Sequence, residues 1–219
     1  MFISLWYVYL CASNHRKLTP DMIQPVYPET LRQLQANPDR LPDEELKLCA
    51  AELVRVHHHE CSSIYRPYSQ VCGLKELHDA RIMHRDIKPE NILISPQGHM
   101  TYADFGLAFT SYDKSVPFRS IRAFDLVGTP GYFAPEILAR TAEQTGYTPA
   151  ADIYSLGLVL LELFGRLSDP FYQATTDAEQ AERMCTKPLY LDEVVENEEA
   201  IQLLFIVRAA CQLPVSFLS

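Results

Sequence analysis

The chain has 219 residues, of which 47% are hydrophobic and 21% are charged, and its net charge is −9. This composition supports a packed domain and excludes general disorder, and the acidic balance argues against nucleic acid as a partner because neutralising phosphates needs a basic face. No apolar run reaches the ~20 residues that span a bilayer, so no membrane role is expected.

The N-terminal segment, residues 2–10, is short, apolar and rich in aromatic and β-branched residues, which predicts a buried strand. The apolar core of a signal peptide is the alternative, but no Lys or Arg precedes the run. Residues 14–28 are polar and contain prolines, which predicts a loop.

Helical spacing of apolar residues follows. It predicts a short helix over 29–35, because Leu31 and Leu34 share one side, and a longer helix from Leu41 to Val54. A proline and three acids open the longer helix, which suits the positive end of a helix dipole. The helical period breaks over 56–72 and resumes from Leu74 to His78.

The second half alternates short strands, loops and helices. We expect strands at 92–94 and 100–103 joined by a turn at Gln97 and Gly98, and a loop over 107–130. The segment 153–164 is apolar on all sides, which predicts a helix buried all round. Further helical stretches are expected at 177–184 and 198–211.

Six cysteines are scattered along the chain, and none forms a C-x-x-C pair. In a chain of this length that pattern fits a reducing compartment better than a disulfide framework. We therefore expect an intracellular location, cytoplasmic or nuclear.

Four motifs carry a chemical signal. They are His84-Arg-Asp-Ile-Lys-Pro-Glu-Asn91, Asp104-Phe-Gly106, Gly128-Thr-Pro-Gly-Tyr-Phe-Ala-Pro-Glu136 and Asp152-Ile-Tyr-Ser-Leu-Gly157. Each is weak alone, but their order is specific, and so is the spacing of 13 residues from Asn91 to Asp104 across a hairpin-like sequence.

The residue types suit phosphoryl transfer, which requires positioning and charge neutralisation. Asp86 can accept the proton of a substrate hydroxyl, and Lys88 can neutralise a transferred phosphate. Asn91 and Asp104 supply the oxygen ligands that Mg²⁺ prefers. Gly106 is expected to give backbone freedom beside Asp104.

The motifs resemble those of the eukaryotic protein kinases: H-R-D-x-K-P-x-N, D-F-G and A-P-E. Lys88 points to the serine/threonine branch. The resemblance implies an α+β fold, namely a mainly α-helical C-lobe with short β-hairpins and at most one remnant N-lobe strand. Residues 1–13 would be that strand and the hinge, and residues 14–219 a C-lobe truncated at its C-terminal end.

The same resemblance implies roles for individual residues. Asp86, Lys88, Asn91 and Asp104 would be catalytic, with ATP and Mg²⁺ as cofactors and a protein Ser/Thr hydroxyl as acceptor. Asn91 and Asp104 would hold the metal, and Ile92 and Leu93 would lie beneath the adenine. The expected supporting residues are His84 and Phe105 in a regulatory stack, Gly106, Thr129 bonded to the catalytic Asp and Lys, Glu136, and Asp152 on the catalytic-loop backbone.

An arginine at the position of Arg85 marks kinases that are switched by a phosphate on the activation segment, which here would run from Asp104 to Glu136. The residue three before Gly128, where the family usually has its phosphorylatable residue, is Asp125. We hypothesise that Asp125 gives Arg85 a standing negative charge; a solvated loop acid is the alternative. Glu90 and Glu162 match positions that face substrate arginines in basophilic kinases.

The sequence departs from the family's pattern in three places. No G-x-G-x-x-G can be written, and no Lys stands in a V-A-I-K-like strand before the catalytic loop. No late D-P-x-x-R-P-like motif supplies a partner for Glu136, and Arg208 is a poor substitute. The 17 residues 56–72 interrupt a helix that is continuous in the family, either as a true insertion or as an error in the gene model.

Two functions remain open. The first is a serine/threonine protein kinase, and the second is an inactive kinase-like fragment that acts as a protein-binding module. The full set of motif residues favours catalysis, and the missing phosphate loop favours the binding module. Affinity for Mg·ATP separates the two.

Overall fold

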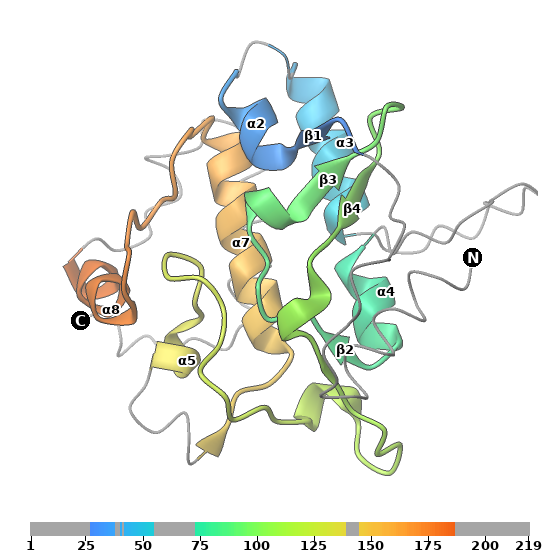
Figure 1. Cartoon of the computed structure of the whole chain (residues 1–219), viewed down its shortest axis with the longest axis vertical. Coiled ribbons are helices and arrows are strands. Elements are labelled where there is room, and N and C mark those ends of the chain that lie inside the picture. Colours follow the sequence, from blue (N-terminus) through green and yellow to red (C-terminus); the bar gives the residue numbers. More distant parts are fainter. Residues whose placement is uncertain (1–26, 38–39, 41, 55–72, 139–144, 187–219) are drawn as a thin grey trace, which may run out of the picture.

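The apolar helix α7 (Ala150–Phe164) runs through the middle of the molecule, and the other elements pack around it (Figure 1). Its residues Leu156, Leu158–Leu161 and Leu163 are at most 3% exposed, which confirms the predicted buried helix. The helix starts three residues before the predicted 153, directly after Pro149. Pro149 is the N-cap residue, and its φ of −55°, which the proline ring fixes, already suits the helix.

The computed structural model describes residues 27–37, 40, 42–54, 73–138 and 145–186. Within them lie helices and two small antiparallel sheets, in agreement with the expected α+β, kinase-like fold. The predicted strand at 2–10, the segment 56–72 and the predicted helix at 198–211 lie outside the described residues.

The first sheet has the strand order β1-β3-β4. β3 (Ile92–Ile94) and β4 (Met100–Tyr102) form the predicted hairpin, with Ile92 opposite Tyr102, and Gly98 takes a φ of 84° in the turn. β1 (Glu29–Thr30) pairs with the other edge of β3.

The helix predicted over 29–35 is therefore shorter than expected. α2 spans Leu31–Gln35, and Thr30 caps it: the Thr30 side chain accepts from the backbone N–H of Gln33, while the Gln33 side chain accepts from that of Thr30. This capping box fixes the helix start and leaves Glu29 and Thr30 free to pair as a strand.

A second sheet joins β2 (Ile82–Met83) to β5 (Phe109–Thr110), with Met83 opposite Phe109. Its strand β5 lies inside the region predicted as a loop, since two residues are too few to show a period. The 3-10 turns η3 (Phe105–Leu107) and η4 (Phe118–Ser120) occupy the same region.

The predicted helices at 41–54 and 74–78 are present as α3 (Asp43–Val54) and α4 (Leu74–Asp79). Leu46, Ala50 and Leu53 of α3 are buried, and burial of each leucine contributes about 1.5–3 kcal/mol. The short α5 (Pro135–Leu138) lies beside α8 (Asp177–Thr186), which confirms the helix predicted at 177–184 (Figure 1).

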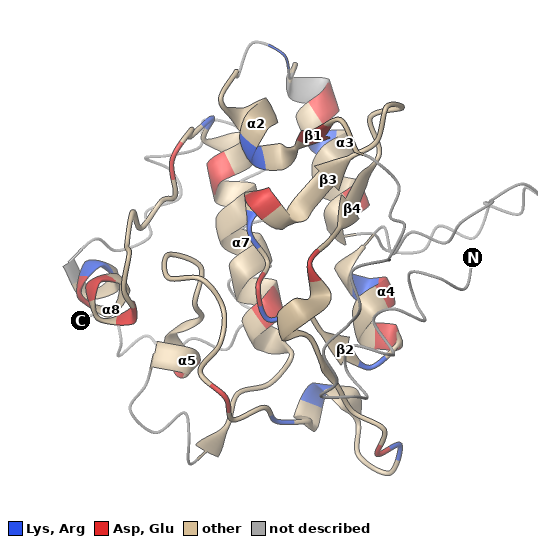
Figure 2. Ribbon diagram, viewed as in Figure 1, with Lys and Arg blue, Asp and Glu red and all other residues tan. Residues whose placement is uncertain are grey.

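Charged residues of both signs are distributed over several of these elements (Figure 2). Among the described residues, no helix combines the length and the apolar character needed to cross a bilayer.

Candidate active site

The segment 84–91, called the catalytic loop below, connects β2 to β3 and ends in the 3-10 turn η2 (Pro89–Asn91). Within this loop, the side chain of Asp86 is buried. The Asn91 Nδ2 donates to the backbone oxygen of Asp86 and to its Oδ2, both at 2.9 Å. Asn91 therefore holds the Asp86 carboxylate in one orientation.

Thr129 connects the activation segment to this loop. Its hydroxyl donates to Asp86 Oδ1 at 2.6 Å and accepts from Lys88 Nζ at 2.6 Å, while Lys88 Nζ also lies 3.1 Å from Asp86 Oδ2. The expected contact of Thr129 with both Asp86 and Lys88 is therefore present. Charged partners make such hydrogen bonds stronger than neutral ones.

Asp104 follows β4 and has a left-handed φ of 57°. Its side chain is exposed and accepts from Gly106 N at 3.3 Å. The unusual backbone angle thus falls on Asp104 and not on Gly106, contrary to the expectation. A Cβ at position 106 would lie 3.2 Å from Asp104 Oδ1, a tight contact that a small shift of this exposed carboxylate would relieve.

The strands bring Asn91 and the Asp104 region together, since Ala103 N donates to Asn91 O at 2.8 Å. His84 and Phe105 are in contact as expected, with ring centroids 4.9 Å apart and the ring planes tilted by 51°. The Nε2–H of His84 donates to Ala103 O at 2.9 Å, and burial lowers the pKa of His84. A neutral His84 therefore links the catalytic loop to the Asp104 segment.

Asp152, in the first turn of α7, is buried beneath the catalytic loop. Its Oδ2 accepts from His84 N and its Oδ1 from Arg85 N, both at 2.8 Å, and His78 Nε2 donates to Oδ2 at 3.0 Å. Burial alone would raise the pKa of Asp152, but the hydrogen bond and charge of His78 and the other donors lower it overall. The carboxylate holds the loop backbone as expected.

Arg85 reaches the activation segment. Its Nη1 lies 3.3 Å from Asp125 Oδ2, and its Nε donates to Leu107 O at 2.6 Å. Tyr147 joins the two sides: its hydroxyl accepts from Arg85 at 3.4 Å and donates to Asp125 O at 2.8 Å. The arginine side chain is 9% exposed and that of Asp125 is 73% exposed.

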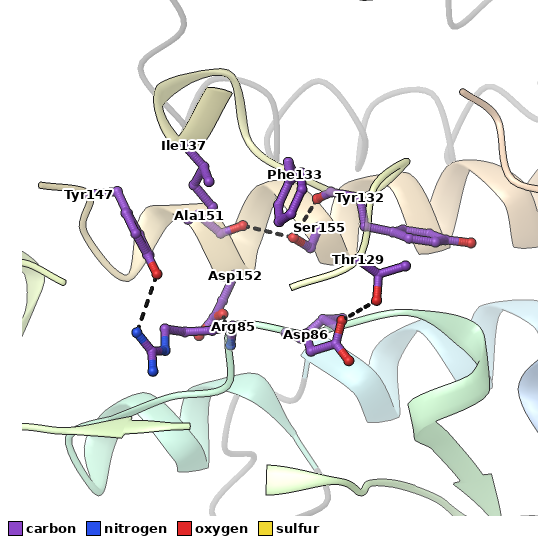
Figure 3. A pocket seen from close by; sticks show the side chains of 11 residues that line it. Arg85, Asp86, Thr129, Tyr132, Phe133, Ile137, Tyr147, Ala151, Asp152 and Ser155 are labelled. Atoms are coloured by element: carbon purple, nitrogen blue, oxygen red, sulfur yellow. Dashed lines mark hydrogen bonds between the residues drawn. The ribbon is translucent and has the colours of Figure 1, made fainter. Parts of the chain in front are cut away.

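A small pocket lies between the catalytic loop, the 129–133 segment and the start of α7 (Figure 3). Figure 3 shows Asp86 pointing toward Thr129, Arg85 pointing toward Tyr147, and Ser155 bonded to the backbone of Tyr132 and Ala151. Three distant stretches of sequence thus meet around Asp86.

The remaining expected site residues are Ile92, Leu93 and Glu136. Ile92 is fully buried in the first sheet, and Leu93 is half-buried between its strand neighbours. Glu136 has a pKa raised by burial and forms no ion pair with any described residue. Arg208, the candidate partner, lies outside the described residues.

Sequence reasoning missed Arg32 and Tyr132. Arg32 lies between Glu90 and Glu162, whose positions match those that face substrate arginines in basophilic kinases. Its Nε is 2.9 Å from Glu90 Oε1 and its Nη2 is 3.2 Å from Glu162 Oε2. Tyr132 accepts from Arg32 and donates to Glu162 Oε2 at 3.0 Å. Burial raises the pKa of Glu162 to about 7. No motif marks Arg32, so only the fold reveals this pairing.

The comparison with protein families agrees with this geometry. The protein kinase domain matches residues 41–205. The chain therefore belongs to the protein kinase family, whose members use ATP and Mg²⁺ and act on protein substrates.

Individual relatives include serine/threonine kinases. A cAMP-dependent protein kinase catalytic subunit-like protein of Caenorhabditis briggsae is 38% identical over 109 residues, which is 50% of this chain and 25% of that protein. The serine/threonine-protein kinase SKM1 of Saccharomyces cerevisiae is 45% identical over 91 residues, 42% of this chain and 12% of that protein. The cGMP-dependent protein kinase of Toxoplasma gondii is 36% identical over 148 residues, 67% and 13% respectively. The aligned part thus spans a quarter or less of each of these relatives.

Proposed function

We propose that the chain acts as a serine/threonine protein kinase that transfers the γ-phosphate of ATP to a protein hydroxyl. The observation that carries the proposal is the joining of Asp86, Lys88 and Thr129 by hydrogen bonds of 2.6 Å, across 43 residues of sequence. A carboxylate and an ammonium group are thereby held side by side where a hydroxyl and a phosphate would react.

The residues divide the chemistry between them. Asp86 accepts the proton of the substrate hydroxyl while the hydroxyl oxygen attacks the γ-phosphorus. At the same time the bond between the γ-phosphorus and the bridging β-phosphate oxygen breaks. Lys88 offsets the charge on the transferred group. ADP leaves with the electron pair of the broken bond.

Asn91 and Asp104 suit a magnesium ion. Both hydrogen bonds of the Asn91 side chain use Nδ2, so its Oδ1 would be the ligand atom, and the exposed Asp104 carboxylate forms no ion pair with a described residue. Mg²⁺ takes one or two such oxygens together with substrate phosphates. Ile92 and Leu93 are proposed to lie beneath the adenine.

The proposal is tested on the full chain with Mg·ATP and a degenerate Ser/Thr peptide library. We expect micromolar binding of Mg·ATP and transfer of labelled phosphate, and we expect Asp104→Asn to weaken Mg-dependent binding by about tenfold or more, because metal-site changes typically cost that much. Asp177→Asn, at an exposed acid of α8, is the matched control and is expected to behave as the wild type.

Absence of Mg·ATP binding by the wild-type chain at millimolar nucleotide would contradict the proposal and would favour a kinase-like binding module. Binding that is equal in wild type and Asp104→Asn would remove Asp104 from the metal site.

We further propose that Asp125 keeps Arg85 paired without a phosphate. Because the pair is largely exposed on the acid side, its contribution is of order 0.2–1 kcal/mol, and Asp125→Ala is expected to lower transfer by about two- to fivefold. Asp125→Glu retains the charge and is expected to restore most of the rate. Equal rates in the alanine variant and the wild type would show that Asp125 is only a solvated acid.

A further inference from the structure

Gln180 of α8 is a fully buried polar side chain outside every motif. Its Oε1 accepts from Gly131 N at 2.8 Å and from Phe133 N at 3.2 Å, and its Nε2 donates to Phe133 O at 2.8 Å. These three hydrogen bonds go to the main chain between the G-T-P and A-P-E motifs, and Nε2 also lies 3.7 Å from Met184 Sδ within α8. We infer that Gln180 is a positioning residue that fixes the 129–133 segment against the catalytic loop.

The chemistry of the contact is specific to an amide. Toward Phe133, the Gln180 side chain offers one acceptor and one donor, as a peptide group in a neighbouring strand would. A leucine of similar size has neither group, and a carboxylate keeps the acceptor but loses the donor. Buried main-chain groups need such partners, because leaving them unpaired costs free energy.

The contact reaches the reacting residues within a few bonds. Tyr132 N donates to Thr129 O at 3.2 Å, and Ser155 Oγ donates to Tyr132 O at 2.8 Å. Gly131, which Gln180 holds through its N–H, has a φ of 98°, an angle that glycine adopts freely. Without Gln180, nothing else among the described contacts fixes the N–H of Gly131, and Thr129 lies two residues away.

Gln180 thus holds the side of the site that carries Thr129, and not the side that carries Asn91 and Asp104. The inference rests on the proposed kinase function. If the inference holds, loss of the Gln180 amide impairs use of the protein substrate, because a small displacement of a positioning group slows transfer strongly. The affinity for Mg·ATP is then unchanged.

The experiment compares Gln180→Leu and Gln180→Glu in the full chain, with Gln97→Leu at an exposed turn as the matched control. We expect kcat/KM for the peptide substrate to fall by about tenfold or more in Gln180→Leu, and at least as far in Gln180→Glu, because an ionised carboxylate there would place an oxygen against Phe133 O. The Kd for Mg·ATP should stay within about twofold of wild type. Hydrogen exchange at the Gly131 and Phe133 amides should quicken in Gln180→Leu.

Three results would overturn the inference. They are an unchanged kcat/KM in Gln180→Leu, an equal loss of Mg·ATP affinity and peptide use, and a fall in the fraction of folded, nucleotide-binding chain that accounts for the whole loss. If Gln180→Leu does not fold, kcat/KM and the Kd for Mg·ATP are compared between Gln180→Glu and wild type instead. Absence of transfer by the wild-type chain would refute both the proposed function and the inference. An active wild type whose Gln180 variants are unchanged would refute the inference alone.

Discussion

Asp86→Asn is expected to slow phosphate transfer by about 10²–10⁴-fold, the range that a positioned general base contributes. Asparagine cannot take the proton of the attacking hydroxyl. The loss should appear in kcat, with Mg·ATP affinity within about twofold of wild type, because Asn91 and Asp104 remain in place.

The substitution should leave the fold intact. The amide oxygen of the new side chain can face Asn91 and Lys88, which both donate, and its NH₂ group can face Thr129, whose hydroxyl oxygen also accepts. Thermal unfolding of Asp86→Asn should therefore match that of wild type and of the control Asp177→Asn. Transfer within tenfold of wild type would exclude Asp86 as the general base.

Asp152→Ala is expected to destabilise the chain by about 2–5 kcal/mol and to stop transfer. Its removal leaves the buried N–H groups of His84 and Arg85 without their acceptor, and each such loss costs about 1–3 kcal/mol. Asparagine is little better here. Both carboxylate oxygens accept from main-chain N–H groups, so an NH₂ group must face a donor in either orientation. Urea unfolding measures the effect, and Asp79→Asn, at an exposed acid of α4, is the control.

The pH dependence gives a second readout for Asp152. Because its pKa in the folded chain is lowered, its contribution is complete above the unfolded pKa of about 3.9 and disappears as pH falls through the folded value. The stability difference between wild type and Asp152→Ala should therefore be constant near neutrality and shrink in acid. A difference that grows as pH falls would contradict this account.

Much of the fold follows from the sequence because its strongest patterns are local. The apolar run of α7 and the hairpin β3-β4 each carry a period or a turn that shows in the sequence. The strands β1 and β5 have two residues each and depend on partners far along the chain, so no local pattern could reveal them.

The site divides in the same way. Asp86, Asn91 and Asp104 stand in motifs whose spacing predicts their chemistry. Arg32 and Gln180 act through contacts 130 and 47 residues away, with Glu162 and Phe133, and their own neighbours in sequence give no signal. The D-F-G motif shows a further limit: the sequence identifies Asp104 and Gly106, but only the structure shows that the left-handed angle lies at Asp104.

The left-handed backbone angles at Arg85 and Asp104, 68° and 57°, set the stability of the site against its chemistry. Each non-glycine residue in this conformation costs of order 1–3 kcal/mol, which is a sizeable share of a typical net stability of about 5–15 kcal/mol. Replacing either residue with glycine would relieve that strain but would remove the guanidinium or the carboxylate from the site. A gain in stability at these two positions would therefore come at the expense of the proposed chemistry.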